Sequence, residues 1–142
     1  MGRILSIDYG KKRTGLAVTD PLCIIAGGLA TVPTDQLTKF LNDYISRETV
    51  DLIVVGEPMQ TNGQPSENLQ RVREFVMKWT AQHPDIPVQW YDERFTSVLA
   101  HRAMIDGGLK KKARQNKALV DEISATIILQ SYMDSRKFQI DR

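Results

Sequence analysis

The sequence predicts an α/β fold, a mixed five-stranded sheet with helices on both of its faces. Two observations indicate this class. Three strand-like segments come first, and helical and strand-like segments then alternate, which gives the order βββαβαβαα. The segment DLIVVG at 51–56 is apolar without a break, as a central strand covered on both faces would be. The length of 142 residues suits one domain, 1–142, with a core of its own.

The N-terminal part of the chain is expected to supply three strands. Apolar residues at 3–9 and the segment TGLAVTD at 14–20 flank the turn-like stretch YGKKRTG, and together they predict a β-hairpin. A third strand is expected at 23–32, where Gly27 and Gly28 predict a bulge or a bend.

Two helices are expected around the fourth strand. Apolar residues recur at helical spacing over 37–45, and Thr34 or Asp35 is expected to cap this helix. After the strand, Ser66 is expected to cap a second helix, whose apolar stripe runs over 69–79.

The C-terminal part predicts one more strand and two more helices. The segment VQWY at 88–91 is strand-like, and a helix is expected to begin at Thr96 or Ser97 and to end at the glycines 107–108. A basic loop then leads to a last helix over 118–133.

Composition excludes several classes of protein. The formal net charge is only +2, so affinity for a polyanion would depend on how the charges are distributed. The single Cys23 forms no internal disulfide, which favours a reduced, cytoplasmic setting. No stretch approaches the roughly 20 apolar residues of a membrane span. Asp8 interrupts the first apolar segment too early for a signal peptide, and no membrane partner is expected.

Acidic residues follow three of the predicted strands. Asp8 ends the first strand, Glu57 follows the fourth, and Asp92 and Glu93 end the fifth. If these strands are parallel, their carboxyl ends lie at one edge, where ligands bind in open α/β sheets. Asp92 and Glu93 alternate along their strand, so a regular strand points only one of them into such a site.

A further acid lies in the last predicted helix. Asp121 shares a helix stripe with Ala125, Ile128 and Tyr132, which are expected to pack on the sheet. An acid on a packing stripe is costly unless it is paired or bound to a metal. Clustered carboxylates repel each other, and divalent cations such as Mg²⁺ relieve that repulsion. Metal-assisted cleavage of a phosphodiester is chemistry that such a site can perform.

Two runs of cations lie close in sequence to candidate acids. One run is 11–13, directly after Asp8, and the other precedes Asp121. The second comprises Lys110, Lys111, Lys112, Arg114 and Lys117. Such runs are often solvated loops, but binding of a phosphate backbone would explain their position.

Five motifs resemble one known family along nearly the whole chain. They are IDYGKKRTGLAVTD at 7–20, IVVGEP at 53–58, NGQPSENLQRVREF at 62–75, DERFTSVLA at 92–100 and KALVDEISATIILQSY at 117–132. In this order they resemble the pre-16S rRNA nuclease family, also called the YqgF-type or Holliday-junction-resolvase-like family. The resemblance implies a ribonuclease H-like fold and metal-dependent hydrolysis of phosphodiester bonds.

The resemblance also implies the roles of individual residues. Asp8, Glu93 and Asp121 would form the catalytic triad and hold Mg²⁺ or Mn²⁺. Many members carry Leu where this chain has Glu57, whereas related resolvases carry a site Glu near this position, so Glu57 is a possible further ligand. The resemblance favours Glu93 over both Glu57 and Asp92.

The expected substrate is nucleic acid, either structured RNA or branched DNA. Arg13, Arg94 and Lys117 are expected near the scissile phosphate. Contacts along the backbone are expected from Lys11, Lys110, Lys111, Lys112 and Arg114. The resemblance favours maturation of the 16S rRNA 5′ end, with possible ribosome association. Two alternatives remain, a Holliday junction resolvase and a non-catalytic nucleic-acid-binding module. A kinase-like nucleotide site would need a second lobe, for which the chain is too short. The chain is expected to act as a monomer or a homodimer.

Overall fold

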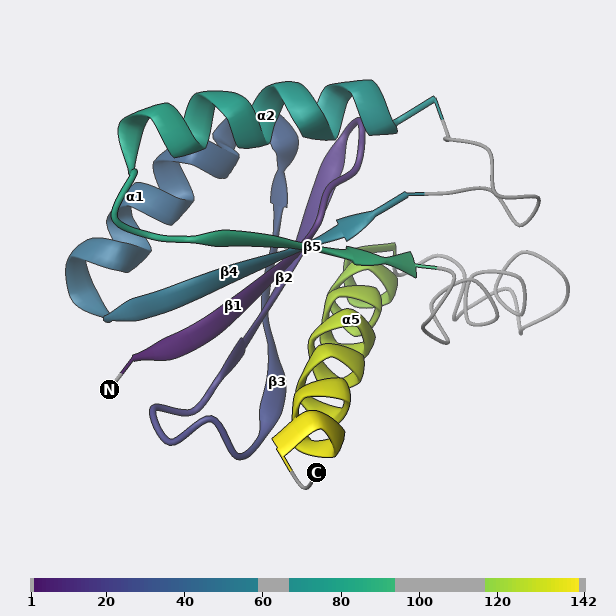
Figure 1. Ribbon diagram of the computed structural model, residues 1–142. Helices are drawn as coiled ribbons and strands as arrows, with labels where there is room; N and C mark the ends of the chain where they lie inside the picture. Colours follow the sequence, from purple (N-terminus) through teal and green to yellow (C-terminus); the bar gives the residue numbers. More distant parts are fainter. Residues whose placement is uncertain (1, 59–66, 94–116, 141–142) are drawn as a thin grey trace, which may run out of the picture.

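The computed structural model describes residues 2–58, 67–93 and 117–140 (Figure 1). The strands are β1 (Arg3–Asp8), β2 (Arg13–Thr19), β3 (Ala26–Pro33), β4 (Val50–Glu57) and β5 (Val88–Asp92). The helices are the 3₁₀ turn η1 (Thr34–Gln36), α1 (Leu37–Arg47), α2 (Leu69–Gln82) and α5 (Lys117–Ile140). No helix in these ranges is long and apolar enough to cross a membrane.

The five strands form one mixed sheet in the order β3-β2-β1-β4-β5. β1 pairs antiparallel with β2, and β2 pairs antiparallel with β3. β1 and β4 are parallel, as are β4 and β5. The predicted sheet is therefore confirmed, and β1, β4 and β5 end at the same edge.

Helices cover both faces of the sheet, as expected. α1 and α2 lie on one face, and α5 crosses the other (Figure 1). The core under α1 and α2 takes alternate residues of each strand, because successive side chains of a strand point to opposite faces. It includes Leu5, Ile7, Ile53 and Val55 from the sheet and Leu41, Val72 and Trp79 from the helices.

The α5 face holds the residues between these in sequence. Val54 packs against Ile128 and Tyr132 of α5, while Ala17 packs against Ala125 and Leu129. Ser6 also points to this face, since its buried hydroxyl donates a hydrogen bond of 2.7 Å to the Ala125 carbonyl. Asp8, two residues after Ser6, therefore belongs to the α5 face as well.

The third strand begins at Ala26, so the prediction of a strand from Cys23 is wrong. The Asp20 carboxylate accepts backbone N–H bonds from Leu22, Ile24 and Ile25 at 3.2, 2.7 and 2.8 Å, which folds these residues into a turn. Cys23 has a positive φ of 57° within this turn. An apolar run indicated a strand here, but a local carboxylate supplied the backbone partners instead.

The bulge predicted at the paired glycines of β3 is confirmed. Leu16 pairs with Ala30, but the next residue of β2, Ala17, pairs with Gly28, so Leu29 is the extra residue. This part of β3 lies close to α5, since an added Cβ on Gly28 would lie 3.6 Å from the Glu122 side chain.

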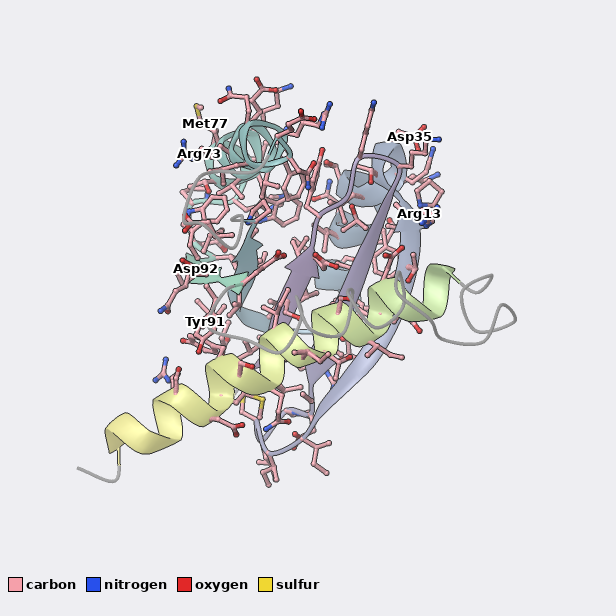
Figure 2. The ribbon with its side chains drawn as sticks, turned by 90° about the vertical axis from the view of Figure 1, so that its right-hand side faces the viewer. Arg13, Asp35, Arg73, Met77, Tyr91 and Asp92 are labelled. Atoms are coloured by element: carbon pink, nitrogen blue, oxygen red, sulfur yellow. The ribbon has the colours of Figure 1, made fainter. Side chains whose placement is uncertain are left out.

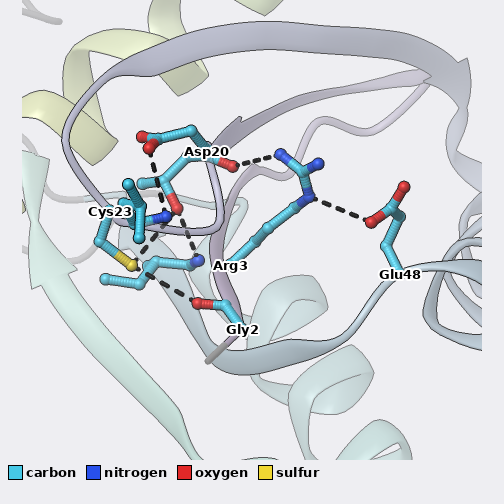
Figure 3. A network of polar contacts seen from close by, with 8 residues as sticks. Gly2, Arg3, Asp20, Cys23 and Glu48 are labelled. Carbon is cyan, nitrogen blue, oxygen red and sulfur yellow. Dashed lines mark hydrogen bonds and ion pairs between the residues drawn. The ribbon is translucent and has the colours of Figure 1, made fainter.

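Polar contacts join the turn after β2 to the start of β1 (Figure 3). The Arg3 guanidinium donates to the Thr19 carbonyl at 2.9 Å and pairs with Glu48 at 3.3 Å. The Cys23 thiol lies 3.5 Å from the Gly2 carbonyl oxygen. Together these contacts close the end of the sheet opposite to the predicted acids.

Two predicted helix boundaries differ from the structure. Neither Thr34 nor Asp35 caps α1, because both lie in η1 and the α1 N-cap is Gln36, which makes no side-chain cap bond. The Thr34 hydroxyl instead donates to the Gly10 carbonyl at 2.6 Å and so supports the β1–β2 turn. α5 spans Lys117–Ile140, longer than the 118–133 expected.

The Ser66 cap, the helix predicted from residue 96 to the glycines 107–108 and most of the predicted basic loop lie outside the described residues.

Candidate active site

Asp8 lies at the centre of the edge where the parallel strands end. It is the last residue of β1, and only 6% of its surface is exposed. On one side it pairs with Gly15 of β2. On the other side Ile7 pairs with Val55 of β4, so Gly56 is the next β4 position. A glycine thus stands on each neighbouring strand, so neither of these two positions places a side chain of its own beside Asp8.

Glu93 follows β5 directly and is only 2% exposed. A Cβ added to Gly56 would lie 3.0 Å from Glu93 Oε1 and 2.7 Å from Ile128 Cδ1. The Glu93 carboxylate therefore lies over Gly56, on the same face as Asp8. Replacing Gly56 by a larger residue would fill the space that this carboxylate occupies.

Asp121 lies over the other glycine, near the start of α5. A Cβ on Gly15 would overlap the Asp121 backbone carbonyl and would lie 3.1 Å from Asp121 Cβ. Arg13, two residues before Gly15, donates from Nε to Asp121 Oδ2 at 3.0 Å. Figure 2 shows Arg13 beside the first turns of α5. The structure thus brings Asp121 to the row that contains Asp8 and neutralises its charge with Arg13.

The three predicted acids therefore share one face, in a row with Asp8 in the middle. Among the described residues, however, no three His, Cys, Asp or Glu side chains approach closely enough to hold one metal ion together. Asp8 and Glu93 are nearly buried, whereas the Asp121 side chain is 24% exposed and bound to Arg13. Carboxylate oxygens are the donors that Mg²⁺ and Mn²⁺ prefer, so the chemistry of this donor set fits such an ion.

Glu57 and Asp92 point to the other face of the sheet. They pair with each other in the β4–β5 register. Two residues earlier on each strand, Val55 and Trp90 contribute to the core under α1 and α2. By alternation, Glu57 and Asp92 belong to that face as well, away from Asp8 and Glu93. Figure 2 shows Asp92 on β5, across the sheet from Arg13.

Only some of the predicted cations can be located. Arg13 reaches the acidic row, while Lys11 is exposed in the β1–β2 turn. Lys117 is the first residue of α5 and not part of a loop, and its side chain lies outside the described residues. Arg94, Lys110, Lys111, Lys112 and Arg114 also lie outside the described residues.

Tyr9, the residue after Asp8, attaches the end of β1 to α2 on the opposite face of the sheet. Tyr9 packs on Phe75 of α2 with ring centroids 5.4 Å apart, and the Asn68 amide donates to the Tyr9 carbonyl at 2.6 Å. Burial raises the pKa of the Tyr9 hydroxyl, an effect that the nearby Arg71 partly offsets. Tyr9 therefore stays a neutral packing group while it fixes the end of β1 to α2.

Sequence reasoning missed the two glycines that make room for the acids. Gly15 and Gly56 lie inside strands, where glycine often marks a close approach of another backbone or side chain. That signal was present in the motifs TGLA and VVGE. It did not say which segment approaches each glycine.

A cavity of about 620 Å³ lies at the opposite end of the same face. It is lined by Gly2, Ile4, Cys23, Leu52 and Met133, among others. Gly2 and Ile4 lie at the beginning of β1, so the cavity is separate from the acidic row at the strand ends.

The sequence is similar to a known family and to named relatives over nearly its whole length. The family model described as "RuvX: Holliday junction resolvase" matches residues 2–135. A protein of Phocaeicola vulgatus named "Putative pre-16S rRNA nuclease" is 65% identical over 138 residues, covering 97% of this chain and 99% of that protein. One of Parabacteroides distasonis with the same name is 62% identical over 140 residues, covering 99% and 100%.

Among solved structures, the fold is similar to that of T. thermophilus RuvC in complex with Holliday junction substrate. The TM-score is 0.57 at 18% sequence identity, and the match covers 96% of both chains. At this identity the likeness concerns the fold alone, and it confirms the predicted ribonuclease H-like fold.

Proposed function

The chain belongs to the RuvX Holliday junction resolvase family, and from this premise we propose that it is a divalent-metal-dependent nuclease. It hydrolyses phosphodiester bonds of nucleic acid. The observation that carries the proposal is the pair of nearly buried carboxylates, Asp8 and Glu93, on one face at the carboxyl ends of parallel strands. Carboxylates gathered at one site repel each other, and binding of a divalent cation relieves that repulsion, which provides a reason for their position.

The three acids have different roles in this proposal. Asp8 and Glu93 hold a Mg²⁺ or Mn²⁺ ion, and Asp121 completes the acidic row from α5. The bound ion supplies positive charge to stabilise the developing charge on the phosphate. Glu57 and Asp92 take no part, because they project from the other face of the sheet.

Arg13 is the proposed first contact of the scissile phosphate. Its guanidinium already binds a carboxylate oxygen at 3.0 Å, and a phosphate oxygen offers similar hydrogen-bond geometry. Its side chain is 40% exposed, so it can reach a bound strand. Further backbone contacts are assigned to Lys11, Arg94, Lys110, Lys111, Lys112, Arg114 and Lys117.

The proposed substrate is the precursor of 16S rRNA, at its 5′ end. Support comes from the names of relatives that share 54–65% of their residues with this chain over nearly its full length. Such a role implies a cytoplasmic location and contact with ribosome precursors. The alternative substrate is a four-way DNA junction, which the family description names. Symmetric cleavage of a junction would need a homodimer, whereas RNA trimming requires only a monomer.

The experiment compares two substrates under one set of conditions. A labelled pre-16S 5′ leader and a four-way DNA junction are incubated with the protein in Mg²⁺, in Mn²⁺ and in EDTA. We expect metal-dependent cleavage of the RNA, and loss of cleavage in Asp8→Asn. Glu93→Gln should also lose cleavage, whereas the matched control Glu57→Gln should retain it because its side chain lies on the other face.

Three outcomes would contradict the proposal. Full cleavage by Asp8→Asn would exclude the acidic row as the active site. Equal RNA binding in EDTA and in Mg²⁺, without any cleavage, would favour a non-catalytic binding module. Preferential cleavage of the four-way junction would move the substrate from RNA to branched DNA.

A further inference from the structure

Ser124 of α5 carries a buried hydroxyl that has no hydrogen-bond partner within residues 2–58, 67–93 and 117–140. The residue is only 1% exposed. Serine and threonine hydroxyls in helices commonly donate to the carbonyl one turn earlier. Thr126, two residues on, does so with the Glu122 carbonyl at 2.8 Å. A buried hydroxyl without a partner is unfavourable and needs an explanation.

The position of Ser124 follows from its neighbours on the same helix stripe. It comes three residues after Asp121, whose backbone contacts Gly15, and four before Ile128, whose side chain contacts Gly56. Those two glycines occupy the strands on either side of β1. Residues three or four apart on a helix share one face, so Ser124 lies between these contacts and above the end of β1.

A second contact places the same turn of the helix along β1. The carbonyl of Ala125, the residue after Ser124, accepts the buried hydrogen bond from Ser6. Ser6 is two residues before Asp8 and points to the same face. Ser124 therefore occupies the turn of α5 that covers the end of β1, where Asp8 lies.

Packing alone does not require a hydroxyl here. Ala125, its neighbour in the same tight contact with the sheet, is fully buried without any polar group. Alanine at position 124 would fill almost the same volume and favour the helix more. The hydroxyl is thus present at a cost, on the face of α5 that covers the end of β1.

We propose that Ser124 belongs to the divalent-ion site, where its hydroxyl hydrogen-bonds the hydration water of the Mg²⁺ or Mn²⁺ held by Asp8 and Glu93. This inference rests on the nuclease function proposed above. Mg²⁺ gives up its water reluctantly, so a site with few protein carboxylates needs polar groups that bind the retained water. Groups in this outer layer also tune metal affinity.

An uncharged oxygen suits this position better than a further acid. Asp8 and Glu93 already supply two negative charges, and Asp121 adds a third that Arg13 offsets. Another carboxylate would repel the phosphate backbone of the substrate. A serine hydroxyl adds a hydrogen-bonding group to the site without adding charge.

The test measures metal binding in the absence of nucleic acid. Full-length protein freed of metal with chelator is titrated with Mn²⁺, and bound ion is counted by electron paramagnetic resonance. We expect Ser124→Ala to weaken Mn²⁺ binding by about 10-fold, which is the typical effect of removing a group that hydrogen-bonds the ligands of a metal. The matched control is Thr126→Ala, which removes a hydroxyl bonded within the same helix and should leave Mn²⁺ affinity unchanged.

Thermal unfolding separates this role from a structural one. Ser124→Ala without metal should melt at the wild-type temperature or slightly above it, since alanine favours the helix. A lower melting temperature, or unchanged Mn²⁺ affinity in Ser124→Ala, would overturn the assignment of Ser124 while leaving the nuclease proposal intact. If the wild-type protein bound no Mn²⁺ and cleaved neither substrate, both proposals would fail together.

Discussion

Replacing Gly15 by alanine tests whether α5 must touch β2 for the acidic row to form. The new Cβ would overlap the carbonyl group of Asp121, which is main chain and cannot rotate away as a side chain could. Overpacking of this kind costs about 1–3 kcal/mol, and a backbone clash favours the upper value. For a chain of this size, about 3 kcal/mol corresponds to a fall in Tm of about 10 °C.

The cleavage rate should fall strongly even at temperatures where the variant stays folded. The clash is relieved only if the start of α5 moves off the sheet, which carries Asp121 away from Asp8. A displacement of about 1 Å costs roughly 100-fold in rate when catalytic groups must be aligned. Cleavage of the pre-16S leader is therefore measured at about 20 °C, well below the expected Tm, after circular dichroism has been used to check that the variant is folded.

The control is Gly27→Ala, in the edge strand β3. A Cβ at Gly27 would meet no atom of the described residues within 4 Å, so stability and cleavage should match the wild type. If Gly15→Ala kept both the wild-type Tm and full cleavage, close contact of α5 with β2 would not be what positions Asp121.

Three further predictions concern single polar groups. Arg13→Gln should change the free energy of unfolding by less than about 1 kcal/mol, because its ion pair with Asp121 is partly exposed. Fluorescence anisotropy of RNA binding should show that the slope of log affinity against log salt concentration becomes shallower by about one, since one phosphate contact is lost. Ser6→Ala removes the buried hydrogen bond that joins β1 to α5, and urea unfolding should show a loss of about 1 kcal/mol. Backbone hydrogen bonds, that from Ile25 first, lower the pKa of Asp20. The Asp20 carboxylate therefore stabilises the fold fully above the ordinary carboxyl pKa of about 4, and this stabilisation is lost as the pH falls through the lowered pKa of the folded state. Asp20→Ala should accordingly reduce Tm at pH 7, and the difference from wild type should shrink in acid.

Much of the fold could be predicted because the local patterns agreed with the tertiary structure. The continuous apolar run of β4 and the strand-helix alternation gave a mixed sheet with β1, β4 and β5 ending at one edge. The start of β3 was predicted wrongly because Asp20 satisfies backbone amides locally, and periodicity does not detect such a bond. The family resemblance is confirmed by relatives that match nearly the whole chain.

The choice among the acids shows the limit of sequence reasoning most clearly. Alternation alone required that Asp92 and Glu93 point to opposite faces, but either could have faced the site. The choice depends on which face of β5 is covered by α5. In the structure, Tyr91 packs toward α5 and Trp90 packs toward α1 and α2, so Glu93 shares the α5 face with Tyr91.

The sequence by itself determined the fold class, the family and the edge at which Asp8 lies, because these depend on local periodicity and on motifs read along the chain. Only the tertiary structure decided which residues meet there. Gly15 touches Asp121 and Gly56 touches Glu93 across separations of more than 35 residues. The unpartnered hydroxyl of Ser124 is likewise defined by the packing of α5 on the sheet. Contacts between distant segments leave no periodic signal in the sequence, since they arise from how the helix crosses the strands.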